Sequence, residues 1–130
     1  MTRPIFYIAT PYSQYAQGRE QAWRDACAAA ATLIKRGLFV FSPVAHSHPI
    51  AEFGDIDPLC HKTWMPLDLA MLDECAGLVV VMMPGWRESI GVQREIAHAI
   101  ETDKSVCYLS WPMLNVRENV EGVRDLLPGS

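Results

Sequence analysis

Four short apolar runs alternate along the chain with longer segments in which apolar residues recur every three or four positions. Short runs rich in β-branched and aromatic residues, bounded by turn residues, are typical of buried strands. We therefore predict strands at residues 4–9, 38–42, 77–83 and 105–109. The third run, GLVVVMM, is the most hydrophobic of the four.

The segments between the predicted strands have helical periodicity. An apolar stripe predicts a helix from about residue 18 to 36, with Gly37 well placed to end it. Thr63 can cap a second helix, which has Pro66 in its first turn and runs to residue 75. A third helix follows the turn PGWRES, and Asn115 can cap a last one over residues 115–127.

Residues 43–62 have no clear period and are rich in His, Pro and Asp. We predict a loop there. Loops of this length are uncommon in compact domains and usually serve a function or move.

This order of strands and helices predicts one α/β domain over residues 1–130: a small doubly wound parallel sheet of four or five strands, flavodoxin-like, with helices on both faces. Such sheets bind ligands beyond the carboxyl ends of the strands, where the strand order reverses. The rule selects three segments for the chemistry: residues 10–13, 43–62 and 84–91.

Composition narrows the classes of partner. A chain of 130 residues with a formal net charge of −4 lacks the basic surface that a nucleic acid polymer needs. A small anionic ligand remains possible, because backbone amides can hold a phosphate. No apolar run approaches membrane-spanning length. The four cysteines are scattered, and Cys27, Cys75 and Cys107, in apolar settings, fit buried thiols in a reducing compartment. We therefore expect a cytoplasmic protein with no membrane partner.

Glu95 stands at the margin of the apolar face of the third helix. Val92 and Ala99 mark that face, and the residues one turn away, Gly91 and Ala99, are too small to cover the carboxylate. Glu95 is either an edge charge, tolerated at the margin of the core, or a carboxylate that takes part in binding or catalysis. As an edge charge it would pair with a neighbouring cation: Arg94, His98 or Arg87.

Asp68 raises the same question, because it falls inside the apolar stripe of the second helix. A buried carboxylate is costly unless it is hydrogen-bonded or shares its site with another charge. The plain alternative is that Asp68 lies near enough to the helix start to interact with free amides. If Asp68 and Glu95 met in one cleft, one could attack or stabilise a cationic sugar carbon while the other handled a proton.

Other candidates lie near the predicted strand ends. Ser89 and Gly91 open a helix whose amides could bind phosphate, although Ser89 could simply cap that helix. Tyr7 could reach a ligand at the tip of the first strand, or be a core tyrosine. Trp86 and Trp64 could stack on a base, or be packing anchors.

The segment 43–62 holds most of the histidines, which raises the question of a metal. The residues concerned are His46, His48, Cys60 and His61. Adjacent Cys and His seldom converge on one ion, so the spacing favours an exposed loop or a ligand lid. We expect no metal and no cofactor.

Three short motifs in order carry a resemblance to a known family. They are YIATP at the end of the first strand, Asp68-Leu69-Ala70-Met71-Leu72 as D-L-x-x-L, and Ser89, Gly91 and Glu95 as S-x-G-x-x-x-E. With them the chain resembles the nucleoside 2-deoxyribosyltransferase superfamily, which includes nucleotide N-glycoside hydrolases. The turn GWRES-x-G is similar to that of small bacterial and phage proteins of the DUF1937 and DUF4406 types.

The resemblance implies roles for these residues. Glu95 would attack the anomeric carbon of a nucleoside or nucleotide, Asp68 would supply or relay a proton near the base, and Tyr7 would orient the glutamate. Ser89 and Gly91 would hold the sugar or its 5′-phosphate. We also expect Thr10 and Trp86 to contact the substrate, and a homodimer or higher homo-oligomer, as is common among relatives.

Two rival functions remain beside this enzyme. One is a nucleotide sensor or binding subunit without catalysis, and the other is a metal-dependent hydrolase built on the histidine segment. The sequence names neither the base nor the sugar, and it does not choose between water and a second base as the acceptor.

Overall fold

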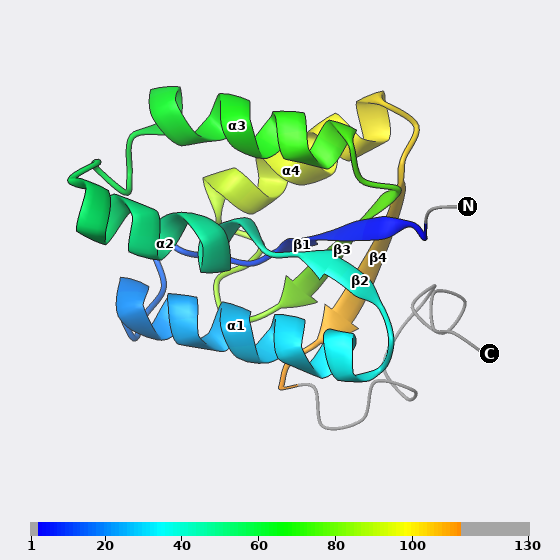
Figure 1. Cartoon of the computed structure of the whole chain (residues 1–130), viewed down its shortest axis with the longest axis horizontal. Coiled ribbons are helices and arrows are strands. Elements are labelled where there is room, and N and C mark those ends of the chain that lie inside the picture. The colour runs from blue at the N-terminus through cyan, green and yellow to red at the C-terminus, as the bar shows by residue number, and fades with distance from the viewer. Residues whose placement is uncertain (1–2, 113–130) are drawn as a thin grey trace.

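The computed structural model describes residues 3–112. Helices follow each of the first three strands along this part of the chain, with two helices, α2 and α3, between β2 and β3 (Figure 1). The elements are β1 (Ile5–Ala9), α1 (Arg19–Lys35), β2 (Phe39–Phe41), α2 (Pro43–Gly54), α3 (His61–Asp73), β3 (Gly77–Met82), α4 (Ile90–Glu101) and β4 (Ser105–Ser110). The predicted helix at residues 115–127 lies outside the described residues.

All strand pairs in the sheet are parallel, and the strands lie in the order β2-β1-β3-β4. The chain moves from β1 to β2 on one side, then returns through α2 and α3 to β3 on the other side of β1. The strand order therefore reverses between β1 and β3. This confirms the prediction of a doubly wound parallel sheet and places its switch point at the carboxyl ends of these two central strands.

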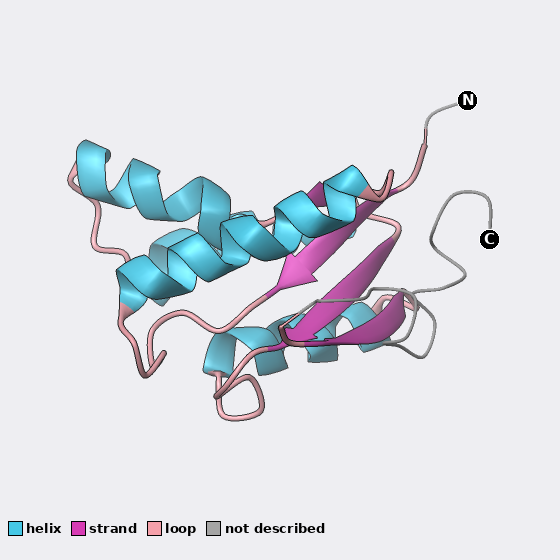
Figure 2. Cartoon of the chain, turned by 90° about the horizontal axis from the view of Figure 1, so that it is seen from below, coloured by secondary structure: helices cyan, strands magenta, loops and turns pink. Residues whose placement is uncertain are grey.

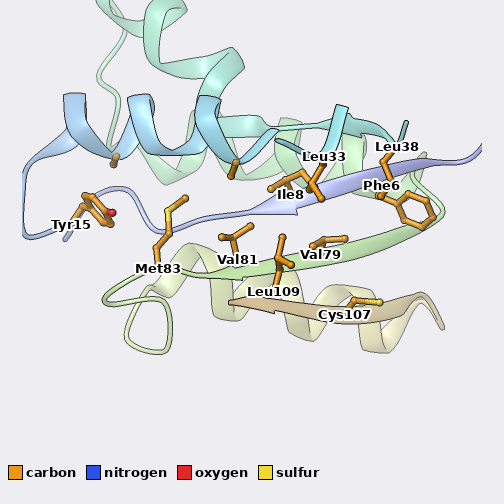
Figure 3. Close-up of a cluster of buried hydrophobic side chains, with 12 residues drawn as sticks. Phe6, Ile8, Tyr15, Leu33, Leu38, Val79, Val81, Met83, Cys107 and Leu109 are labelled. Atoms are coloured by element: carbon orange, nitrogen blue, oxygen red, sulfur yellow. The ribbon is translucent and has the colours of Figure 1, made fainter. Parts of the chain in front are cut away.

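Alternate residues of the central strands bury opposite faces of the sheet. On one face Val79 and Val81 of β3 pack with Ile8 of β1 against Leu33 of α1 (Figure 3). On the other face Leu78 and Val80 of β3 pack against α3 and α4. The sheet therefore lies between helices on both sides, as predicted (Figure 2). Burial on both faces explains why β3 reads as a continuous apolar run.

The prediction of a loop over residues 43–62 is wrong for its first part, which forms α2 and packs against α1. Ser42 caps this helix by accepting a hydrogen bond from the Ala45 amide at 3.2 Å, and Pro43 occupies its first turn. Pro49 lies inside the helix, where it lacks an N–H and breaks one backbone bond. In the sequence, Pro49 argues against a helix here, although Ser42 and Pro43 mark the start of one.

Two smaller predictions also need correction. Helix α3 begins at His61 and is preceded by Cys60, so Thr63 does not cap it and Pro66 lies beyond its first turn. Cys75 and Cys107 are buried as expected, whereas Cys27 is only partly buried.

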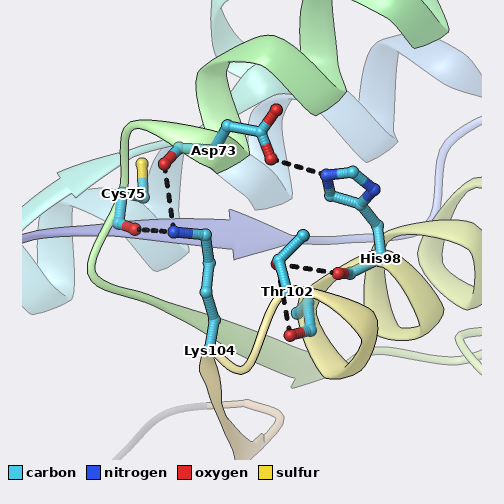
Figure 4. A network of polar contacts seen from close by, with 6 residues as sticks. Asp73, Cys75, His98, Thr102 and Lys104 are labelled. Atoms are coloured by element: carbon cyan, nitrogen blue, oxygen red, sulfur yellow. Dashed lines mark hydrogen bonds and ion pairs between the residues drawn. The ribbon is translucent and has the colours of Figure 1, made fainter.

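A polar network ties α3 to α4 and to the start of β4 (Figure 4). The Lys104 ammonium donates to the carbonyl oxygens of Asp73 at 3.0 Å and of Cys75 at 2.8 Å, just where α3 ends. The Asp73 carboxylate lies 2.6 Å from Nε2 of His98 on α4. A cation near the carbonyl end of a helix is stabilising, so Lys104 holds the end of α3. Together with the contact between Asp73 and His98, it fixes how α3 and α4 lie relative to each other.

Within residues 3–112, no helix combines the length and the apolar character that crossing a membrane would need.

Candidate active site

A cavity of about 90 Å³ opens at the carboxyl ends of the strands. Each of the three segments selected from the sequence contributes residues to its lining: residues 10–13 after β1, residues 43–62 after β2, and, from residues 84–91, Ser89 and Gly91 at the start of α4. Asp68 on α3 and Glu95 on α4 reach the same cavity. The fold therefore places two acids from separate helices at one hollow.

Glu95 lies on the floor of this cavity and is only 5% exposed. The Tyr7 hydroxyl donates a hydrogen bond to its Oε2 atom. Tyr7 is fully buried in β1, so the sheet itself holds the carboxyl group in one orientation. Both side chains belong to the buried layer between the sheet and the helices α3 and α4.

The structure excludes the alternative that Glu95 is an edge charge. No ion pair between Glu95 and a cation occurs in the described part of the chain, and His98 pairs instead with Asp73. Glu95 is therefore a buried acid whose partner is a neutral phenol.

Burial raises the pKa of Glu95 to about 8, and the nearby charge of Asp68 raises it too, while the Tyr7 hydrogen bond opposes them. Burial also raises the pKa of Asp68, to about 6. The pKa of Tyr7 is raised by burial and then by the charges of Glu95 and Asp68, so Tyr7 stays a hydrogen-bond donor. Two coupled acids that titrate around neutral pH are suited to proton transfer.

Asp68 is partly buried on α3. It is the eighth residue of that helix, which excludes the alternative of an interaction with the free amides of the first turn. Its raised pKa has burial as its cause and no neighbouring cation lowers it. Asp68 is thus an acid that keeps its proton to a higher pH than an exposed aspartate does.

Ser89 and Gly91 lie at the start of α4, beside Glu95. The Ser89 hydroxyl oxygen accepts from the Val92 amide at 3.2 Å, so it caps α4, and it also lines the cavity. A Cβ atom added at Gly91 would meet only the Ser89 Oγ, at 4.0 Å. Gly91 therefore leaves open space at the cavity that Glu95 also lines, rather than serving an unusual backbone conformation.

Thr10 is the first residue after β1 and lines the same cavity. It is 5% exposed, and its hydroxyl has no hydrogen-bond partner among residues 3–112. Buried hydroxyl groups nearly always have a partner, so this one is unusual.

A family model described as "Domain of unknown function (DUF1937)" matches residues 3–111. The chain belongs to the DUF1937 family. This match confirms the resemblance that the GWRES-x-G turn suggested, and it spans every residue of the cavity described above. No curated protein matches the chain.

The structure of this DUF1937 domain places Trp86 outside the cavity. Its ring packs against Tyr108 with the ring centroids 5.7 Å apart, and the Arg87 guanidinium lies 5.2 Å from the Trp86 ring. Trp64 lines the cavity instead, and its indole N–H donates to the Asp57 carbonyl at 2.9 Å. Both tryptophans therefore anchor the fold, and of the two only Trp64 lines the cavity that holds Asp68 and Glu95.

The histidines of the DUF1937 domain have other neighbours. The His48 ring stacks on Trp23, and its Nδ1 lies 2.6 Å from the Tyr12 hydroxyl oxygen. His61 lies at the cavity wall and His46 packs against Phe41. Over the described residues, no group of three or more His, Cys, Asp or Glu side chains is placed to hold a metal ion.

Sequence reasoning missed the wall that α2 provides. Pro43, Val44 and Ser47 line the cavity from the first turns of this helix. The pair Ser42-Pro43, a helix cap followed by a first-turn proline, was the signal that could have found it.

Proposed function

We propose that this DUF1937 domain cleaves or transfers the N-glycosidic bond of a nucleoside or nucleotide, with Glu95 as the nucleophile. One observation carries the proposal: a buried glutamate, held by Tyr7, lies in the same cavity as a second acid whose pKa is raised. This pairing of two acids is what displacement at an anomeric carbon requires. The superfamily resemblance of the three sequence motifs supports it.

The reaction balances with these two groups alone. The Glu95 carboxylate attacks the anomeric carbon and forms a glycosyl ester, while the carbon–nitrogen bond breaks and its electron pair stays on the base. The carboxylic acid of Asp68 gives the departing nitrogen its proton. Water or a second base then attacks the same carbon, releases Glu95 as the carboxylate, and returns a proton to Asp68.

The protonation states needed are an ionised Glu95 and a protonated Asp68. The hydrogen bond from Tyr7 favours the ionised form of Glu95, and burial favours the protonated form of Asp68. Since the two charges interact, the acids titrate as a pair that shares protons over the neutral range. With the pKa of Glu95 at about 8 and that of Asp68 at about 6, the singly protonated pair holds its proton mainly on Glu95. The reactive form is therefore the minor one, in which this proton lies on Asp68.

A second candidate is a nucleotide-binding protein without catalysis. The observation that favours it is the pKa of Glu95, raised to about 8, because a protonated glutamate in a deep cavity can donate a hydrogen bond to a ligand. This candidate predicts ligand-induced stabilisation with no product.

The decisive experiment measures free base released from ribonucleosides, 2′-deoxynucleosides and their 5′-monophosphates, with and without a second base as acceptor. Wild type should give product, and Glu95→Gln and Glu95→Ala should lose it while remaining folded. Glu101→Gln, an exposed change at the end of the same helix, is the matched control and should be fully active. Equal turnover by wild type and both Glu95 variants would remove Glu95 as the nucleophile.

We also expect the domain to act as a homodimer or higher homo-oligomer. Sedimentation of the ligand-free protein would test this, and a monomer with full activity would contradict it.

A further inference from the structure

One buried hydroxyl at the cavity differs from the others. Tyr12, Ser47 and Ser89 line the cavity and Tyr7 contacts Glu95, and each of these four hydroxyls has a hydrogen bond within the protein. Ser13 also lines the cavity, but it is exposed to water. The Thr10 hydroxyl has none with any residue from 3 to 112, although its side chain is nearly as inaccessible as the core. A buried hydroxyl without a partner destabilises the ligand-free protein, so its retention needs another reason.

The depth of Thr10 limits what can bind it. Thr10 and Glu95 are both 5% exposed, so a ligand atom that reaches either of them lies at the bottom of the hollow. Thr10 comes directly after β1, the strand whose Tyr7 holds Glu95. If the anomeric carbon lies at Glu95, the sugar ring occupies the bottom of the cavity and the base extends toward its mouth.

We infer that the Thr10 hydroxyl binds a hydroxyl group of the substrate's pentose and so determines which sugars the domain accepts. This inference rests on the proposed function, because it takes the sugar to lie over Glu95. Its physical basis is that a buried hydroxyl already without a partner gains a hydrogen bond only from a ligand that supplies one, so that ligand binds more tightly than its analogue. A sugar lacking the matching hydroxyl would leave Thr10 as it is in the free protein.

Thr10→Val tests this, since valine keeps the shape of threonine and removes the hydroxyl. In the ligand-free protein we expect no fall in Tm, because no internal hydrogen bond is lost. On the sugar that carries the matching hydroxyl we expect kcat/KM to fall about tenfold. On the analogue without that hydroxyl, wild type and Thr10→Val should differ less than twofold.

Ribonucleosides, 2′-deoxynucleosides and 2′,3′-dideoxynucleosides of the common bases are the probes, and they separate the 2′-hydroxyl from the 3′-hydroxyl. Thr10→Ser keeps the hydroxyl and should recover the discrimination between sugars. Thr32→Val is the matched control, since Thr32 lies on α1 away from the cavity and its hydroxyl donates to the Ala28 carbonyl at 3.0 Å. If wild type binds these probes without turnover, the ligand-induced rise in Tm replaces kcat/KM as the readout.

The outcomes distinguish this inference from the proposed function. If wild type cleaves nucleosides but Thr10→Val loses the same factor on every sugar, or nothing on any, the inference is overturned and the function stands. A Tm clearly below that of wild type in the ligand-free variant would also overturn it, because the hydroxyl would then have a structural partner. If wild type neither binds nor cleaves any probe, the proposed function fails and the inference fails with it.

Discussion

Replacing Glu95 with glutamine should stabilise the protein at alkaline pH even as it removes the proposed nucleophile. Glu95 is buried, and no cation among residues 3–112 pairs with it to compensate its charge. Glutamine has nearly the same shape, can accept the Tyr7 hydrogen bond, and never ionises. The difference between the two proteins therefore isolates the free-energy cost of the buried charge.

The pKa shift sets the sign and the size of the effect. The pKa of Glu95 rises from 4.5 to about 8 on folding, so the folded protein holds this proton more tightly than the unfolded chain. The stability that comes from this difference is fully present below about pH 4.5 and is lost as the pH rises to about 8. At about 1.4 kcal/mol per pH unit the loss is about 5 kcal/mol, which is an upper bound if water enters the cavity.

Urea unfolding at pH 5 and pH 8.5 would measure this for wild type, Glu95→Gln and the exposed control Glu101→Gln. Asp68 is present in all three proteins, so its own titration cancels to first order. We expect Glu95→Gln to gain about 2–5 kcal/mol over wild type between the two pH values, and the control to gain nothing. A difference between wild type and Glu95→Gln that stays constant with pH would refute a buried, uncompensated Glu95.

Three further predictions concern residues near Glu95: Gly91, Tyr7 and Asp68. Gly91→Ala should fold with equal or slightly greater stability, up to about 1 kcal/mol from helix propensity, yet reduce kcat/KM because its methyl group enters the cavity; undiminished activity would mean that no ligand passes over this position. Tyr7→Phe should lower the free energy of unfolding by about 1–2 kcal/mol and raise the pKa of Glu95, because the hydrogen bond that favours its ionised form is lost. Urea unfolding checks the loss of stability, and the pH dependence of the free energy of unfolding checks the pKa of Glu95. Asp68→Asn should lower the pKa of Glu95, since the charge of Asp68 raises it, and reduce kcat by about 10²-fold or more as the proton donor is lost. If the pKa of Glu95, measured from the pH dependence of unfolding, is the same as in wild type, the two acids do not interact.

The fold could be predicted because each strand and helix is marked by a pattern within its own stretch of sequence. An apolar run such as β3 reports burial on both faces, and the alternation of strands and helices restricts the topology to few choices. The switch-point rule then selected the three segments that line the cavity. The prediction failed where one local signal opposed another: Pro49 inside α2 argued against a helix that Ser42 and Pro43 announce.

Periodicity along the chain also indicated that Glu95 and Asp68 were unusual, because it shows which face of a helix turns inward. Only the family resemblance pointed to Tyr7 as the partner of Glu95. Periodicity could not name this partner, since Tyr7 lies 88 positions away and contacts Glu95 only through the order of the strands. For the same reason the sequence did not separate Trp64 at the cavity from Trp86 against Tyr108, nor mark Thr10 as the hydroxyl without a partner. The sequence determined which side chains are buried and near which strand end they lie; the tertiary structure alone decided which of them meet, because those contacts depend on how distant elements pack together.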